Sequence, residues 1–133
     1  VGLGPAPSPA EVADRLDSMS ELIRLEEAPA PVVAGLIHAE LATLRPFVRG
    51  NGLVARAMER AYIQASGLDP TGVAVPEEGY VAAGPTYIGA LTAYGMHGAN
   101  GVSVFLQAAF RAQVAGADEG VRIADAVLRG RLS

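Results

Sequence analysis

Cysteine and lysine are both absent from this chain. Without cysteine, the protein can rely neither on a disulfide scaffold nor on thiolate chemistry. No apolar run approaches the roughly 20 residues that a membrane-spanning helix needs, so we expect no membrane partner. No secretory or targeting pattern opens the sequence, and we therefore expect a cytoplasmic protein.

The charge balance is acidic. Ten arginines supply all of the positive side-chain charge against 14 aspartate and glutamate residues, which gives a formal net charge of −4. A nucleic-acid partner is not expected, because phosphate-backbone binding requires a concentrated basic surface. Arginine forms rigid bidentate contacts with phosphate and carboxylate, so each arginine beside a loop is a candidate anion ligand.

Length and hydrophobic pattern predict the architecture. A chain of 133 residues can bury one core, and we expect a single domain over 1–133. Apolar residues recur at helical spacing without sustained two-residue alternation, so we expect an all-α fold. A loop is expected from Gly95 to Gly101, and Gly116 is expected to kink or interrupt the last helix. The predicted helices cover about 8–25, 31–44, 53–66 and 102–128, with two short helices between 76 and 94.

Start and stop signals mark several of these helices. Ser8 can cap the first helix, with Pro9 at the first helical position and Glu11 completing a capping box. Pro46 ends the second helix, because proline disfavours helical geometry in the residue before it. Gly67 is a left-handed stop for the third helix. The predicted core contains Val12, Leu16, Ile23, Leu36, Ile37, Leu41 and Leu44, with Phe47 as an anchor beneath the following loop.

The segment between the second and third predicted helices carries most of the functional information. It reads RPFVRGNGLVAR from Arg45 to Arg56, and the third helix is expected to begin just after Gly50, Asn51 and Gly52. The first N–H groups of a helix lack internal partners and lie at the positive end of its dipole. Glycines let the backbone approach a bound group closely, and Asn51 tolerates left-handed geometry. These residues therefore predict an anion-binding nest, with Arg56 reaching back to the same anion. The alternative is that Asn-Gly is simply a common turn dipeptide.

The same segment resembles the signature HPFx(D/E)GNGRxxR of the Fic family, aligned without a gap. The matching positions are Pro46, Phe47, Gly50, Asn51, Gly52 and Arg56. The preceding IHAELATL is similar to the family's motif helix, and the resemblance extends over about residues 5–70. It implies a Fic-like all-α domain with the motif loop between two central antiparallel helices. It also implies chemistry in which a protein hydroxyl attacks the α-phosphate of ATP.

Three positions depart from this signature. Arg45 stands where active members have the histidine that takes the proton from the target hydroxyl. Arg49 replaces the acid that holds magnesium, and Leu53 replaces an arginine that helps hold the nucleotide phosphates. Arginine stays protonated at any relevant pH, so it serves neither as a general base nor as a cation ligand. The resemblance therefore implies a degenerate member without a magnesium requirement, with ATP or phosphate as candidate ligands. Two placements of Arg45 and Arg49 remain open: they converge on the anion with Arg56, or they point to solvent.

Three functions remain open at this point. The first is a degenerate Fic domain that binds an anion or a protein partner. The second is an active nucleotidyl- or phosphotransferase with a rearranged site, and the third is a structural or interaction domain. In the family a β-hairpin flap positions the target protein; it would lie upstream of Val1, so we expect a processed or partial chain. The family's inhibitory S/TxxxE(G/N) motif is not evident, because Ala115 stands where serine or threonine is needed.

The remaining polar residues are weaker candidates. His38, two helical turns before the loop, is a candidate replacement base, but a buried histidine with local hydrogen bonds is the expected arrangement. His97 is expected to be exposed. Glu40 and Glu59 are expected to be solvated or paired with arginine, and the spacing of the two histidines does not predict a zinc site.

Overall fold

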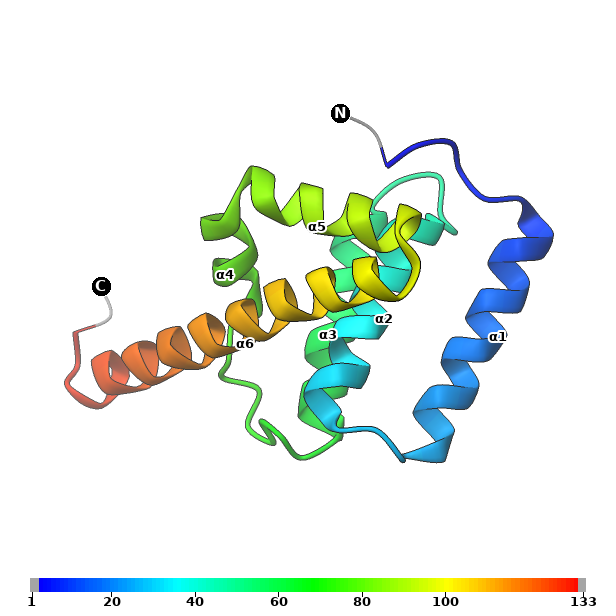
Figure 1. Ribbon diagram of the computed structural model, residues 1–133. Coiled ribbons are helices and arrows are strands. Elements are labelled where there is room, and N and C mark those ends of the chain that lie inside the picture. The colour runs from blue at the N-terminus through cyan, green and yellow to red at the C-terminus, as the bar shows by residue number, and fades with distance from the viewer. Residues whose placement is uncertain (1–2, 132–133) are drawn as a thin grey trace.

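Residues 3–131, the part of the chain that the computed structural model describes, form six α-helices and no strand (Figure 1). None of these helices combines the length and the apolar character needed to cross a membrane. The predicted all-α fold is confirmed. The helices are α1 (Pro9–Leu25), α2 (Ala30–Leu44), α3 (Asn51–Ala65), α4 (Pro76–Ala83), α5 (Pro85–Met96) and α6 (Gly98–Leu128).

Helix α1 begins as its sequence signal predicts. The Ser8 hydroxyl accepts a hydrogen bond from the Glu11 backbone N–H at 3.2 Å, and Pro9 occupies the first helical position. The helix lies to one side of the molecule (Figure 1) and none of its residues is fully buried. Leu16 and Ile23 are therefore only partly buried against the core that they were expected to share.

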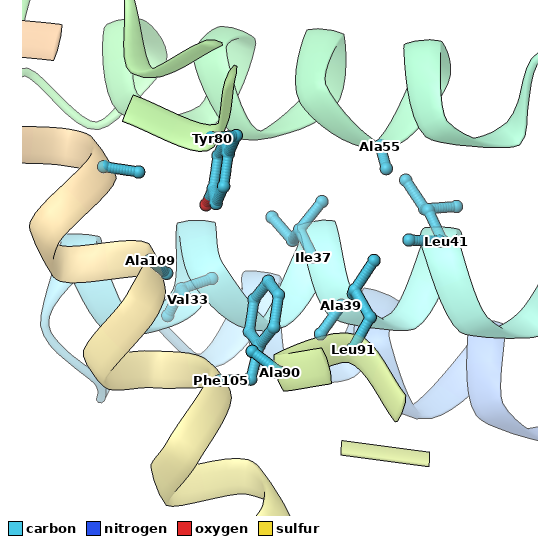
Figure 2. Packing of buried hydrophobic residues seen from close by; sticks show 12 residues of the cluster. Val33, Ile37, Ala39, Leu41, Ala55, Tyr80, Ala90, Leu91, Phe105 and Ala109 are labelled. Carbon is cyan, nitrogen blue, oxygen red and sulfur yellow. The ribbon is translucent and has the colours of Figure 1, made fainter. Parts of the chain in front are cut away.

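Helix α2 is the centre of the core. It is apolar almost all round, and it packs against α1, α3, α5 and α6. In Figure 2, Ala55 of α3 lies on one side of α2, while Leu91 of α5 and Phe105 of α6 lie on the other. Each large apolar side chain buried here stabilises the fold by roughly 1.5–3 kcal/mol. The predicted core members Ile37, Leu41 and Leu44 are confirmed as buried.

Helices α2 and α3 run antiparallel, side by side, and a short loop joins them (Figure 1). This arrangement confirms the predicted loop between two central helices. Helix α3 begins at Asn51, two residues before the predicted Leu53. At its other end Gly67 is left-handed, with φ 81°, as expected for a stop signal.

The predicted loop from Gly95 to Gly101 is wrong. Helix α5 continues to Met96, and α6 begins at Gly98 after a turn at His97. Gly98 is left-handed, with φ 53°, which turns the chain within very few residues. Gly101 then lies against the backbone of α5: a Cβ there would come 1.9 Å from the Ala93 carbonyl oxygen. This glycine serves close helix packing, not loop flexibility.

Helix α6 is also unbroken at Gly116, where an interruption was expected. Gly116 is buried, and a Cβ there would come 2.4 Å from the backbone nitrogen of Pro76. Its carbonyl accepts a hydrogen bond from Val75 N–H at 2.9 Å, which joins the α3–α4 connector directly to α6. The distal end of α6 projects past α4 (Figure 1).

Candidate functional site

The loop between α2 and α3 is bounded by two left-handed residues. Helix α2 ends at Arg45, with φ 51° and ψ 56°, whose N–H donates to Leu41 O at 3.3 Å. Gly50, with φ 77°, precedes the first residue of α3. Left-handed geometry suits glycine but strains an arginine, so tertiary contacts must hold Arg45 in place. Asn51, expected to tolerate a left-handed turn, is instead the first residue of the helix.

The Asn51 side chain closes this loop. Its Oδ1 accepts a hydrogen bond from Phe47 N–H at 2.9 Å, and its Nδ2 donates to Phe47 O at 2.8 Å. The Phe47 ring is 52% exposed, so the prediction of a buried anchor is wrong. The loop extends beyond the paired helices, with residues 47–50 all exposed, and the ring has no core to enter. A side-chain amide bonded to the backbone holds the loop instead.

The first turn of α3 is open. No side chain caps it, and its first intrahelical hydrogen bond runs from Val54 N–H to Gly50 O at 2.9 Å. The N–H groups of the residues before Val54 therefore have no intrahelical acceptor, and they lie at the positive end of the helix dipole. An Arg56 guanidinium nitrogen lies 3.3 Å from the position of a Cβ at Gly52. Arg56 thus lies beside the first turn of α3.

Arg45 and Arg49 do not join Arg56 there. Arg45 Nη2 donates to Gly4 O at 3.0 Å, which attaches the N-terminal lead-in to the end of α2. Its Nε is buried and has no hydrogen-bond partner within residues 3–131. Arg49 is exposed. Of the three candidate arginines, only Arg56 lies beside the first turn of α3.

A polar cluster joins five helices: His38, Glu59 and Tyr80 are buried, and Tyr87 and Gln113 are partly buried. His38 is fully buried; its Nδ1 lies 2.7 Å from Glu59 Oε2 and its Nε2 lies 2.8 Å from the Tyr87 hydroxyl. Glu59 Oε1 accepts hydrogen bonds from Tyr80 and Gln113, both at 3.0 Å. The expected buried, hydrogen-bonded His38 is confirmed.

A neutral His38 gives the cluster a consistent direction of donation. Glu59, as a carboxylate, only accepts, so His38 carries its proton on Nδ1 and donates to it. His38 Nε2 then accepts from the Tyr87 hydroxyl. Burial raises the pKa of Tyr87, and the neighbouring Arg56 guanidinium acts in the opposite direction. The cluster therefore connects Arg56, at the loop, to a buried carboxylate in the core.

Glu59 does not lie where it was expected. It was expected in solvent or paired with arginine, but it is 1% exposed and pairs with His38. The available signal was its four-residue spacing from Ala55 and Ile63, the two other buried residues of α3. Glu40, in contrast, does pair with an arginine: Arg15 Nε donates to its Oε2 at 3.0 Å.

The family model described as Fic/DOC family matches residues 2–63. That range contains α1, α2, the loop and nearly all of α3. Over this segment the chain is similar to the Fic/DOC family. No match was found among the curated proteins or among the solved structures. Helices α4 to α6 lie outside the matched Fic/DOC segment, yet they supply Tyr80, Tyr87 and Gln113 to the polar cluster.

Two substitutions test how the Fic/DOC loop is held. Asn51→Ala should lower the free energy of unfolding by about 1–2 kcal/mol, because it removes both hydrogen bonds to Phe47. Phe47→Ala should cost less, about 1 kcal/mol, because half of the ring is already in water. Urea denaturation of the two variants and the parent protein measures both values. A larger loss for Phe47→Ala would show that the ring, not the amide, holds the loop.

Proposed function

We propose that this protein is a degenerate Fic domain that binds a phosphate-like anion at the first turn of α3 and transfers no AMP. The observation that carries this proposal is the occupation of the motif's histidine and acid positions by Arg45 and Arg49, beside a retained glycine-rich turn with Arg56 facing it. The loop then works as an anion-binding element, available to a free phosphate or to an anionic group on a partner protein.

Transfer chemistry lacks its acting groups in this loop. A general base must accept a proton from the target hydroxyl, and arginine remains protonated. Neutralisation of developing phosphoryl charge by magnesium needs a carboxylate ligand, and Arg49 supplies none. His38 is no substitute base, because both of its ring nitrogens are engaged by Glu59 and Tyr87 and its side chain is fully buried. These features favour binding over the alternative of a rearranged, active transferase.

Anion binding draws on three features of the same turn. The uncapped N–H groups at the start of α3 are donors without partners within the helix. Gly52 permits close approach, and Arg56 adds a fixed positive charge and directed donors. Leu53, which is mostly exposed, adds no phosphate contact. We therefore expect weak binding with little preference for ATP over inorganic phosphate.

Titration with inorganic phosphate and with ATP, followed by NMR shifts, tests the binding. We expect millimolar affinity that is unchanged by magnesium and reduced by salt, because the site is open to solvent. Arg56→Gln should abolish the shifts of Gly52 and Leu53. Arg111→Gln, which removes an exposed arginine of α6, is the matched control and should leave them intact. The absence of any shift at millimolar anion would leave only a protein-interaction role.

Incubation with labelled ATP, magnesium and lysate proteins tests the missing chemistry. The parent protein should transfer no AMP to itself or to other proteins. The combined reversion Arg45→His, Arg49→Asp and Leu53→Arg is expected to restore at most weak labelling. Labelling by the parent protein that disappears in Arg56→Gln would instead support the active-transferase alternative.

A further inference from the structure

Helix α6 carries an apolar seam on a face that is not its core face. Its core face consists of the small residues and Phe105 that pack against α2, α4 and α5. The seam repeats at alternating spacings of four and three residues, the pattern of a helix that pairs with another helix. Its members are Phe110, Val114, Ala117, Val121, Ala124 and Leu128.

The first half of the seam lines an apolar groove. Phe110, Val114 and Ala117 form one wall of a cavity of about 550 Å³. The opposite wall comes from the start of α2 and the end of α3, including Val32 and Ile63. Val114 is 63% exposed even so, which means that residues 3–131 do not fill this groove.

The second half of the seam projects away from the core. Val121 is 69% exposed and Leu128 is 84% exposed, on the part of α6 that extends past α4 (Figure 1). Large apolar side chains arranged in one row on a projecting helix are unusual for a surface without a partner. Each copy of the chain thus has an unfilled apolar groove and, on the same helix face, an uncovered apolar helix end.

A second copy of the chain fits both features at once. When two α6 helices pair antiparallel about a two-fold axis, the projecting end of each enters the groove of the other. The register that keeps the two rows facing places Phe110 opposite Leu128, Val114 opposite Ala124 and Ala117 opposite Val121 of the second copy. A large side chain meets a smaller one in the two inner layers, as close packing of paired helices requires. A parallel pair would instead bring the two projecting ends together and leave both grooves empty.

The charges beside the seam agree with this register. Arg111 follows the first seam residue and Asp125 follows the fifth, so both lie on the same flank of the seam. Antiparallel pairing brings Arg111 of one copy close to Asp125 of the other. Two such attractive pairs form per dimer, and each Asp125 is shared with Arg129 of its own chain, whose Nη2 lies 2.7 Å from Asp125 Oδ2. Asp118, also on this flank, meets its own counterpart near the axis, and that like-charge contact weakens the pair. Arg111 forms no ion pair with any of residues 3–131.

We propose that the chain forms a two-fold homodimer through antiparallel pairing of α6 along this seam. The overlap, residues 110–128, is about 28 Å long at 1.5 Å per residue, which is a short interface. We expect dissociation in the micromolar range. The inference rests on the seam and the groove, and it does not depend on anion binding at the loop.

Sedimentation equilibrium from micromolar to near-millimolar protein tests the dimer. Val121→Asp should raise the dissociation constant by about tenfold or more, because it places a charge in the seam. Val104→Asp is the matched control: an exposed valine on another face of the same helix, whose replacement should leave the constant unchanged. Asp118→Asn should tighten the dimer. A chain that stays monomeric throughout this range would overturn the proposal and leave the groove to a different protein.

Engineered cysteines test the antiparallel register, since the natural chain has none to interfere. Val114→Cys and Ala124→Cys are prepared separately, mixed and oxidised mildly. Antiparallel pairing predicts mainly the mixed disulfide between the two variants, identified by mass spectrometry. Disulfides that join two copies of the same variant, in place of the mixed product, would indicate parallel pairing and overturn the proposal.

Discussion

Glu59→Ala is expected to lower the free energy of unfolding by about 3–5 kcal/mol, because it removes the acceptor of three hydrogen-bond donors in the interior, each of which costs about 1–3 kcal/mol when left unsatisfied. Glu59 accepts hydrogen bonds from three donors, on His38, Tyr80 and Gln113. The donor atoms of His38 and Tyr80 have no other acceptor among residues 3–131, whereas the Gln113 amide also donates to Pro31 O at 3.2 Å. Denaturant unfolding, monitored by far-ultraviolet circular dichroism, measures the loss.

Glu77→Ala is the matched control. Glu77 pairs with Arg60 at 3.6 Å, and both side chains are partly exposed. An ion pair of this kind contributes at most about 1 kcal/mol. If Glu59→Ala costs no more than Glu77→Ala, the polar cluster does not stabilise the fold in the way described above.

Gly101→Ala is expected to cost about 3 kcal/mol or more, because the added methyl group would overlap the α5 backbone. The new Cβ would come 1.9 Å from the carbonyl oxygen of Ala93 and 2.6 Å from its carbonyl carbon. Backbone atoms in a helix cannot move aside as the end of a long side chain can, so the two helices would have to separate. Thermal unfolding and denaturant titration both report the change.

Gly89→Ala on α5 separates this overlap from the ordinary effect of removing a helical glycine. A Cβ at Gly89 meets no atom within 4 Å, and the residue lies within the helix. Alanine there should raise the free energy of unfolding by about 0.5–1 kcal/mol through its better helix propensity. Opposite signs for the two substitutions are the expected result; a loss at both positions would contradict the packing described for Gly101.

Local signals in the sequence were enough to predict most of the fold. The hydroxyl of Ser8, the ring of Pro46 and the backbone freedom of Gly67 act within a few residues, so their effects could be read before any tertiary contact was known. The same holds for the apolar spacing of α2. The position of the loop and its family resemblance followed from these local features.

The errors came from residues whose role depends on distant parts of the chain. Gly101 was expected in a loop and Gly116 at a break in the last helix, but each is the point at which another segment crosses α6. Phe47 read as core, although its loop extends beyond the core. Glu59 read as surface because its partners come from α2, α4 and α6. Spacing along one helix cannot reveal which residues another helix will bring to it.

Arg45 illustrates how contacts unrelated to a sequence signature can hold a residue in place. The residue that matches the histidine of the Fic signature has a left-handed backbone, and its guanidinium attaches the lead-in through Gly4. A return to histidine would keep the backbone strain. It would also remove this hydrogen bond, because the histidine side chain is shorter than that of arginine and does not reach the Gly4 carbonyl. If the chain is the degenerate Fic domain proposed above, reverting this position alone would therefore cost stability before any chemistry returned.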